Sequence, residues 1–349
     1  MNNIKVIVID DSALVRETFR KILSPYKHIQ VQTAQNPYDA VQKIKQDTPD
    51  VIILDIEMPK MDGLTFLKKI MSQHPIPVII CSTFTTSGSK ETMDALEYGA
   101  ISIITKPKVG AKKFFEENIY EIVYNIESAY KAKEKGTFSN MKYKKYIKNI
   151  ENKKEPIQRT TDKIVAIGAS AGGTEAIRYI LKKLPADLNA GIIIVQHMPE
   201  KFTRDFADRL NEECAIYISE AKENDNVSLG RVLIAPGGKH MEIYRSGAKY
   251  YISLNNNPPV NYNRPSVNVL FESVAKNAGK NSMGILLTGM GSDGATGLLS
   301  MNQKGAFTIV QDEQSSIVWG MPKKAWDIGA ADDIYPLKDI PEIIISKMI

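Results

Sequence analysis

The sequence predicts two α/β domains, and three observations support this fold class. The chain has 349 residues, which is long enough for two packed domains. Short apolar runs alternate with segments of helical periodicity in both halves, a pattern typical of parallel sheets covered on both faces by helices. A polar, lysine-rich stretch at residues 129–160 interrupts this alternation. We therefore expect an N-terminal domain at residues 1–128, a linker, and a C-terminal domain at residues 161–349.

The N-terminal half predicts a small, doubly wound, flavodoxin-like domain with five parallel strands. Its apolar runs, which we expect to be strands, lie at 4–9, 29–33, 51–54, 78–81 and 101–104. The amphipathic segments predict helices at 13–23, 38–46, 64–72, 90–98 and 112–131. Because the strands are apolar throughout rather than alternating, both faces of the sheet should be covered.

The C-terminal half predicts a second doubly wound domain with a mainly parallel sheet. The expected strands lie at 164–167, 191–196, 215–220, 231–235, 283–288 and 307–310. Helical periodicity occurs at 174–183, 204–211, 267–277 and 294–303. Two further apolar runs, 241–244 and 250–254, are joined by Ser246-Gly247 and predict a β-hairpin.

Composition narrows the function classes. The net charge of +5 would suit a nucleic-acid partner, but much of the excess lies in the lysine-rich stretch, which favours a solvated linker and no such partner. No apolar run has membrane-spanning length, the N-terminus predicts a strand rather than a signal peptide, and two cysteines are too few for a disulfide framework. We therefore expect a cytoplasmic protein that is not inserted in a membrane, with a monomer as the default.

Charged residues follow three strands of the first domain. Asp10 and Asp11 come after the first strand, Asp55 after the third and Lys106 after the fifth. These side chains should cluster, because the carboxyl ends of parallel strands meet at one edge of the sheet. Ligands bind at this edge in open α/β sheets. One such acidic residue alone is usually a helix cap or a solvated group. Three together need a cation such as Mg²⁺ and predict a carboxylate that attacks a phosphoryl group, with Lys106 and Ser82 contacting its oxygens.

Ser170 lies between an apolar run and a helical segment, in Gly168-Ala-Ser170-Ala-Gly172-Gly173. A Gly-x-Ser-x-Gly turn after a strand exposes the serine oxygen at the sheet edge. The backbone N–H groups of the following helix then point toward a bound substrate. The pattern predicts a catalytic nucleophile.

A serine nucleophile needs a base and a group that orients the base. His197 ends the strand at 191–196 and should emerge at the same sheet edge, whereas His240 could line the pocket. Asp293 follows another apolar run and is the expected partner of the histidine, although an Asp there is also a common helix N-cap. Its rivals, Asp205 and Asp208, fall within an amphipathic helix.

Two other interpretations of the glycine-flanked serine are weaker. In an α/β-hydrolase the triad follows the order Ser, Asp, His, whereas the order here is Ser170, His197, Asp293. Dinucleotide-binding turns have the spacing Gly-x-Gly-x-x-Gly, and Ser170 occupies the place of the second glycine. The sequence therefore favours a serine hydrolase with a different fold.

About the first 125 residues resemble the receiver domain of bacterial two-component response regulators. The matching motifs are Val-Ile-Asp10-Asp11-Ser, Leu-Asp55-Ile-Glu-Met-Pro-Lys-Met-Asp-Gly63, Ser82-Thr83 and Thr-Lys106-Pro107. The resemblance implies that Asp55 accepts a phosphoryl group from a histidine kinase. It also implies that Asp10 and Asp11 hold Mg²⁺ beside Asp55, and that Glu57 lends the ion a backbone carbonyl.

The half from Ile164 to about Leu337 resembles the catalytic domain of chemotaxis protein-glutamate methylesterases, the CheB family, whose architecture is a receiver followed by this domain. The matching motifs are Gly-Ala-Ser170-Ala-Gly-Gly-Thr-Glu-Ala, Gln-His197-Met-Pro, Ala-Pro-Gly-Gly-Lys-His240, Arg264-Pro-Ser-Val, Leu-Thr-Gly-Met290-Gly-Ser-Asp293-Gly-Ala and Trp-Gly-Met321-Pro. By this resemblance Ser170 is the nucleophile, His197 the base and Asp293 its partner. Ala171 stands where the family often has Thr, and Asn268 where it often has Asp.

The resemblance implies a phosphorylation-activated hydrolase that removes γ-glutamyl methyl esters from chemoreceptor helices and deamidates selected glutamines. Backbone N–H groups near Ala171 and Met290 would stabilise the oxyanion, and the esterase site would need no metal or organic cofactor. The unphosphorylated receiver is expected to pack over the Ser170 cleft and to open it when Asp55 is phosphorylated.

Two other functions remain as alternatives. The first is a phosphorylation-dependent binding protein with an idle esterase site. The second is a transcriptional regulator, which is weaker because no compact helix-turn-helix stands out after residue 130.

Overall fold

The structure is a computed structural model that describes residues 3–58, 62–83, 86–107, 110–134 and 161–348. The chain divides into two compact units, Met1–Lys144 and Lys145–Ile349, which we describe separately. Most of the predicted linker lies outside the described residues. The last helix of the first unit, α6 (Ile119–Glu134), continues past the expected domain boundary at residue 128, with Ala129 and Ala132 buried on its inner face.

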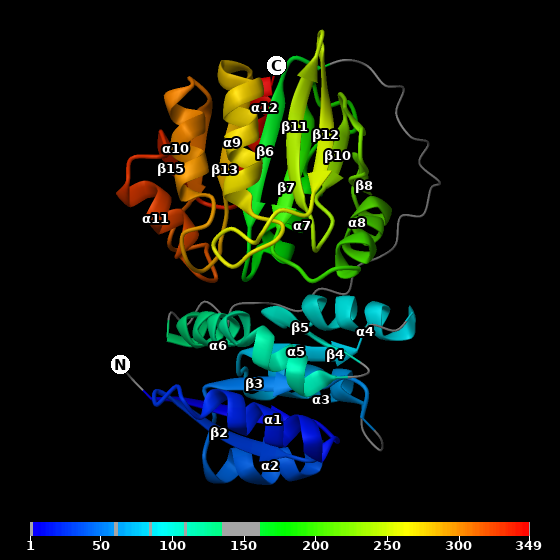
Figure 1. The fold of residues 1–349 in the computed structure, drawn as a ribbon, viewed down its shortest axis with the longest axis vertical. Helices are drawn as coiled ribbons and strands as arrows, with labels where there is room; N and C mark the ends of the chain where they lie inside the picture. Colours follow the sequence, from blue (N-terminus) through cyan, green and yellow to red (C-terminus); the bar gives the residue numbers. More distant parts are fainter. Residues whose placement is uncertain (1–2, 59–61, 84–85, 108–109, 135–160, 349) are drawn as a thin grey trace. The chain divides into compact units, whose positions relative to one another are not determined.

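The first unit is a five-stranded parallel sheet with strand order β2-β1-β3-β4-β5 (Figure 1). The strands are β1 (Ile4–Ile9), β2 (Ile29–Ala34), β3 (Val51–Leu54), β4 (Val78–Thr83) and β5 (Ser102–Lys106). The helices before α6 are α1 (Ala13–Leu23), α2 (Pro37–Gln46), α3 (Gly63–Gln73), α4 (Thr86–Glu97) and α5 (Ala111–Glu117). The predicted fold is confirmed, and the predicted single helix at 112–131 is corrected to two, because the backbone of Asn118 leaves the helical conformation, with φ −106° and ψ 20°.

Side-chain caps explain where several helices of this unit begin. Ser12, Asn36 and Asp62 each accept a hydrogen bond from a backbone N–H in the first turn of α1, α2 and α3, respectively. Such caps satisfy donors that have no partner inside the helix. They define the residue at which each of these three helices begins.

The second unit has a seven-stranded sheet with strand order β15-β14-β13-β6-β7-β10-β8, all parallel. Its strands are β6 (Ile164–Ala169), β7 (Gly191–Gln196), β8 (Tyr217–Glu220), β10 (Arg231–Ile234), β13 (Ser282–Leu286), β14 (Phe307–Gln311) and β15 (Asp333–Tyr335). A separate antiparallel sheet consists of β9 (Asn226–Val227), β11 (His240–Ser246) and β12 (Lys249–Asn255). The mainly parallel sheet and the hairpin are thus confirmed.

The helices of this unit are α7 (Gly173–Leu181), α8 (Phe202–Glu213), α9 (Val267–Asn277), α10 (Ala295–Gln303), α11 (Met321–Asp327) and α12 (Ile340–Met348). In Figure 1, α9 and α10 pack side by side in front of the sheet, and α12 is seen behind it. No helix in the described part of the chain has both the length and the hydrophobicity needed to cross a membrane.

Two strands and two α-helices in the described part of the second unit were not predicted. The strands β9 and β15 have two and three residues, too few for a periodic pattern to be recognised. The helix α11 is a seven-residue segment with proline in its first turn. The fourth, α12, is largely apolar and so lacks the polar positions that mark an amphipathic helix.

Candidate active site and phosphate-accepting site

The turn at Ser170 is tight and closely packed. Ser170 directly follows β6, its N–H donates to the carbonyl of Thr288 at 3.0 Å, and its own carbonyl accepts from the N–H of Gly173, the first residue of α7, at 2.7 Å. Gly172 has φ 74°, a left-handed conformation that suits glycine, and a Cβ atom there would lie 2.6 Å from Ile317. Ser170 is therefore held on a strand-to-helix elbow, as expected of a nucleophile.

His197 emerges beside Ser170 at the same edge of the sheet. Ala169 and Gln196 are register partners on β6 and β7, so the serine and the histidine directly follow paired residues. The N–H of His197 also donates to the carbonyl of Ala169 at 3.1 Å. The parallel pairing of β6 and β7 thus places Ser170 and His197 at the same edge of the sheet, as the sequence predicted.

Asp293 lies 2.8 Å from His197, measured from its Oδ2 to the ring Nε2. An ionised carboxylate only accepts hydrogen bonds, so Nε2 is the donor in this contact, and in the neutral imidazole Nδ1 carries the lone pair. Nδ1 is buried and has no hydrogen-bond partner among the described residues. It is the nitrogen of His197 that can accept a proton from a serine hydroxyl.

The carboxylate of Asp293 is buried and surrounded by donors. They are Ser266 Oγ at 2.7 Å, the N–H of Val267 at 2.7 Å, the N–H of Asn268 at 3.2 Å and Asn261 Nδ2 at 3.2 Å. Burial alone would raise the pKa of Asp293, but the hydrogen bonds from His197, Ser266 and Val267 outweigh it and hold the pKa below its ordinary value. Asp293 is therefore an ionised partner for the histidine.

The same carboxylate also caps a helix. The alternative prediction made Asp293 an N-cap, but α10, which follows it, has Gly294 at the N-cap position. Asp293 instead accepts from the N–H groups of Val267 and Asn268, the first two residues of α9. A negative charge there is stabilised by the helix dipole. The rivals Asp205 and Asp208 lie on α8, and the carboxylate bonded to His197 belongs to Asp293.

Both ring nitrogens of His240 are engaged in hydrogen bonds. Its Nδ1 accepts from the N–H of Ser266 at 3.2 Å, so its Nε2 carries the proton and donates to the carbonyl of Pro258 at 3.0 Å. The ring is 1% exposed. Its two nitrogens hold the loop that brings Ser266 to Asp293, a structural role that the position after Gly-Gly-Lys gave no means of predicting.

Two buried residues that were not assigned roles fix the nucleophile turn. The side-chain amide of Gln196 donates to the carbonyls of Ser170 and His197, at 3.0 Å in each case. The hydroxyl of Thr288 donates to the carbonyl of Ala171 at 2.9 Å. Both residues lie in motifs quoted above, but only the folded chain reveals which atoms they contact. The backbone around Ser170 is thus held from both sides.

The expected oxyanion residues are close to this turn. Ala171 and Met290 are buried, and Met290 follows Gly289, where a Cβ atom would lie 2.8 Å from the Cβ of Ser170. Asn268, the departure from the family pattern, uses its Oδ1 to accept from the N–H of Gly297. The side chain at position 268 therefore joins α9 to α10.

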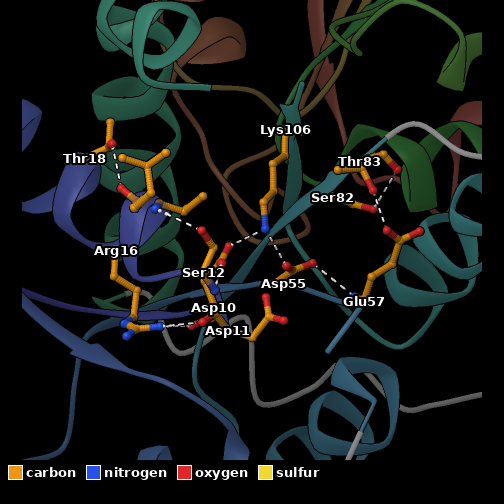
Figure 2. Close-up of polar contacts among 12 residues, drawn as sticks. Asp10, Asp11, Ser12, Arg16, Thr18, Asp55, Glu57, Ser82, Thr83 and Lys106 are labelled. Atoms are coloured by element: carbon orange, nitrogen blue, oxygen red, sulfur yellow. Dashed lines mark hydrogen bonds and ion pairs between the residues drawn. The ribbon is translucent and has the colours of Figure 1, made fainter. Parts of the chain in front are cut away.

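The acidic residues of the first unit cluster as predicted (Figure 2). Lys106 Nζ bonds Asp10 Oδ2 at 2.8 Å and Asp55 Oδ2 at 2.7 Å. Asp10 Oδ1 accepts from the N–H of Ser12, and Asp55 Oδ1 from the N–H of Glu57. Burial favours the neutral amine of Lys106, but the two carboxylates outweigh it and raise its pKa above the ordinary value. The lysine stays charged between them.

The donor set fits a hard divalent cation. One carboxylate oxygen from each of Asp10, Asp11 and Asp55 lies within 4.8 Å of the other two, and Asp11 is exposed. Burial is the main cause that raises the pKa of Asp10, and it raises the pKa of Asp55 to about 6. Carboxylates that share so small a volume repel one another, and a cation with oxygen ligands relieves that repulsion.

Two residues near Asp55 make contacts that the sequence did not predict. The carboxylate of Glu57 accepts from the hydroxyl of Thr83, and the hydroxyl of Ser82 donates to the carbonyl of Thr83 at 3.3 Å (Figure 2). The expected roles of the Glu57 carbonyl and of Ser82 toward a phosphoryl group stay predictions.

Two family models match the chain. The model "CheB methylesterase" matches residues 165–344, and the model "Response regulator receiver domain" matches residues 6–116. Each match coincides with one of the two units and contains the residues of its proposed site.

Relatives match over nearly the whole length. The protein-glutamate methylesterase/protein-glutamine glutaminase 3 of Geobacter metallireducens is 49% identical over 352 residues, covering 99% of each chain. A protein of the same name from Leptospira interrogans is 50% identical over 340 residues, covering 97% of this chain and 98% of its own. The crystal structure of the Thermotoga maritima CheB methylesterase catalytic domain, at 34% identity, superposes with a TM-score of 0.52 over 53% of this chain and 98% of its own. With these matches and this arrangement of residues, the chain belongs to the CheB methylesterase family and has that family's catalytic domain preceded by a response-regulator receiver domain.

Proposed function

We propose that this protein is a phosphorylation-activated hydrolase that removes γ-glutamyl methyl esters from chemoreceptors, and that it also deamidates selected receptor glutamines. The observation that carries the proposal is the bond between His197 and the buried Asp293, next to Ser170 at the same edge of the sheet. The names of the full-length relatives support both activities. Residues 1–128, extended to the end of α6, would be the regulatory domain, residues 161–349 the catalytic domain, and the residues between them a linker.

The first half of the reaction forms an acyl-enzyme. Nδ1 of His197 takes the proton of the Ser170 hydroxyl as its oxygen attacks the ester carbonyl. The ionised Asp293 keeps the imidazole in the tautomer with its proton on Nε2 and stabilises the imidazolium that forms. The imidazolium then protonates the departing methoxide, which leaves as methanol.

The second half restores the enzyme. A water molecule gives a proton to His197 and attacks the acyl group, and Ser170 leaves with that proton as a free hydroxyl, so the product is a glutamate carboxyl group. Backbone N–H groups near Ala171 and Met290 would stabilise the oxyanion in both halves, and losing one such donor costs about 2.7–4 kcal/mol of barrier. With a glutamine as the substrate, ammonia leaves in place of methanol and the later steps are the same.

The receiver would control access to this site. Asp55 would accept a phosphoryl group from a histidine kinase, and Asp10, Asp11 and Asp55 would hold Mg²⁺, which supplies charge neutralisation there. Lys106 already bonds Asp55 and is positioned to follow a phosphoryl group attached to it. The added charge of about −1.5 to −2 would replace one carboxylate charge and draw Ser82 toward it.

The alternative, a phosphorylation-dependent binding protein with an idle site, is not favoured. An idle site would have no need for a buried carboxylate that is kept ionised next to a histidine whose second ring nitrogen has no hydrogen-bond partner among the described residues.

The test is methanol release from methylated receptor-bearing membranes. Wild type and Ser170→Ala are compared with and without Mg²⁺ and acetyl phosphate, and Ser300→Ala, on the solvent side of α10, is the matched serine control. The proposal expects release that needs Ser170, survives Ser300→Ala and rises with the phosphodonor. Methanol release that does not respond to the phosphodonor would support the esterase activity and contradict its activation by phosphorylation. No release under any condition would favour the binding protein.

A further inference from the structure

A tight turn lies within the loop between β12 and α9, and this loop is drawn in yellow in Figure 1. Val260 and Asn263 face each other across it, and each donates its N–H to the carbonyl of the other, at 3.1 Å and 2.9 Å. The two residues between them, Asn261 and Tyr262, have φ values of 50° and 64°. Positive φ at both central positions is the signature of a type I′ turn, which strongly prefers Asn-Gly.

Tyr262 is the unexpected residue in this turn. Asn tolerates a left-handed backbone and is common at the first central position, but a bulky aromatic side chain at positive φ is strained. Tyr262 is 76% exposed and the neighbouring Val260 is 37% exposed, so both side chains are accessible at the surface of the second unit.

The turn is attached directly to the candidate active site. The side-chain amide of Asn261 donates to Oδ1 of Asp293, and the amide of Asn263 holds the carbonyl of Asn261 at 2.6 Å. Tyr262 is thus the chain neighbour of a residue that touches the catalytic carboxylate.

We propose that Tyr262, with Val260 beside it, is a specificity-determining contact for the polypeptide segment on either side of the modified glutamate. The inference rests on the proposed esterase function and goes beyond it by naming the contact that separates a protein substrate from a small ester. An exposed tyrosine suits this role, because its ring gives a large rigid contact at low entropic cost and its hydroxyl tolerates a partly wet interface. A free γ-methyl ester would reach Ser170 without touching it.

The variant Tyr262→Gly tests the proposal with two readouts of opposite sign. It gives the turn its preferred Asn-Gly sequence, so the melting temperature of the second unit should rise by about 2–4 °C. It also removes the ring, so kcat/KM for methanol release from methylated receptor membranes should fall about tenfold or more, mainly through KM. Hydrolysis of a blocked glutamate γ-methyl ester should keep the wild-type rate. Tyr262→Phe should retain most of the receptor activity.

The matched control is Tyr244→Ala, which removes a half-exposed tyrosine on the hairpin strand β11. It should leave both substrates unaffected. If Tyr262→Gly demethylates receptors as well as wild type does, the inference is wrong while the proposed function stands. If it raises the rate without a phosphodonor, the turn contacts the receiver instead, which also overturns the inference. If wild type releases no methanol, the proposed function fails first and the inference fails with it.

Discussion

Gly173 and Gln196 are packed so closely that a Cβ atom at position 173 would lie 2.1 Å from Oε1 of Gln196. The side chain of Gln196 cannot move aside cheaply, because its amide nitrogen is held by the carbonyls of Ser170 and His197. Gly173 therefore leaves space for the buried side-chain amide of Gln196. This amide links the backbone of Ser170, the proposed nucleophile, to the backbone of His197, the proposed base. Neither side chain of the proposed catalytic pair takes part in this link.

We predict that Gln196→Met will lower kcat for methanol release by about ten- to a hundredfold. Methionine keeps the length of the side chain but donates no hydrogen bond, so the two carbonyls lose a shared donor and the relative position of Ser170 and His197 relaxes. Near-wild-type circular dichroism would show that the fold persists. Gln314→Met, an exposed glutamine on the loop after β14, is the control. An unchanged kcat would mean that the link has no positioning role.

We also predict that the contacts of His240 and Ser266 have separable effects. Ser266→Ala removes a donor from Asp293 and should lower kcat several-fold with little change in KM. His240→Phe leaves the buried N–H of Ser266 without its acceptor and removes the donor to the carbonyl of Pro258, which should lower the free energy of unfolding by about 1–3 kcal/mol and also lower kcat.

The control for this pair of variants is Ser282→Ala, a buried serine at the start of β13 that bonds only the carbonyl of Gly279 in the described structure. It should change kcat little. Equal losses of kcat in Ser266→Ala and Ser282→Ala would assign the effect of Ser266 to general packing rather than to Asp293.

The parallel sheets explain why much of both sites could be predicted. Asp10, Asp55 and Lys106 lie at the ends of three strands of the first sheet, and Ser170 and His197 lie at the ends of two strands of the second sheet. In each parallel sheet such strand ends lie at one edge, whatever the conformation of the helices between them. Strand ends can be read from apolar runs, so the clusters could be predicted without knowing any loop.

Contacts made by loops could not be predicted in this way. The sequence leaves Asp293 as either a partner of histidine or an N-cap of the helix that follows it. In the structure it bonds His197, and instead of capping α10 it accepts from the first two N–H groups of α9, which lie 25 and 26 residues away in sequence. The role of His240 depends on Pro258 and Ser266, which belong to a loop with no periodic pattern. Such contacts are set by how loops fold back, and local sequence carries little of that information.

Removing residues 1–150 should raise the basal esterase rate if the unphosphorylated receiver covers the site. The remaining unit contains its own seven-stranded sheet and core, so it has what it needs to fold. The measurement is methanol release by the fragment and by the full chain, both without a phosphodonor. A fragment that is well folded by circular dichroism but no faster than the full chain would reject inhibition by the receiver.

The last prediction concerns pH and Mg²⁺ at Asp55. Its pKa is raised from 3.8 to about 6, chiefly by burial, so the folded receiver binds more protons than the unfolded chain between these values. Stability then falls as pH rises through this window, and the ionised carboxyl costs on the order of 2–3 kcal/mol above it. Lys106 stays charged throughout, since its raised pKa lies far above the window. The melting temperature of the first unit should therefore be higher at about pH 5 than at about pH 7.5.

Asp55→Asn isolates this group, because an amide has the same shape and never ionises. The variant should be more stable than wild type at about pH 7.5 without Mg²⁺ and should lose most of the pH dependence. Mg²⁺ should stabilise wild type more at the higher pH, where the carboxylates are ionised, and should stabilise the variant less because one anionic ligand is gone. Calorimetry of the full chain under these conditions measures all three effects. If the melting temperatures of wild type and Asp55→Asn change equally with pH, Asp55 is not the carboxyl group responsible for the pH dependence. If Mg²⁺ stabilises both proteins equally, Asp55 is not a ligand of the proposed ion.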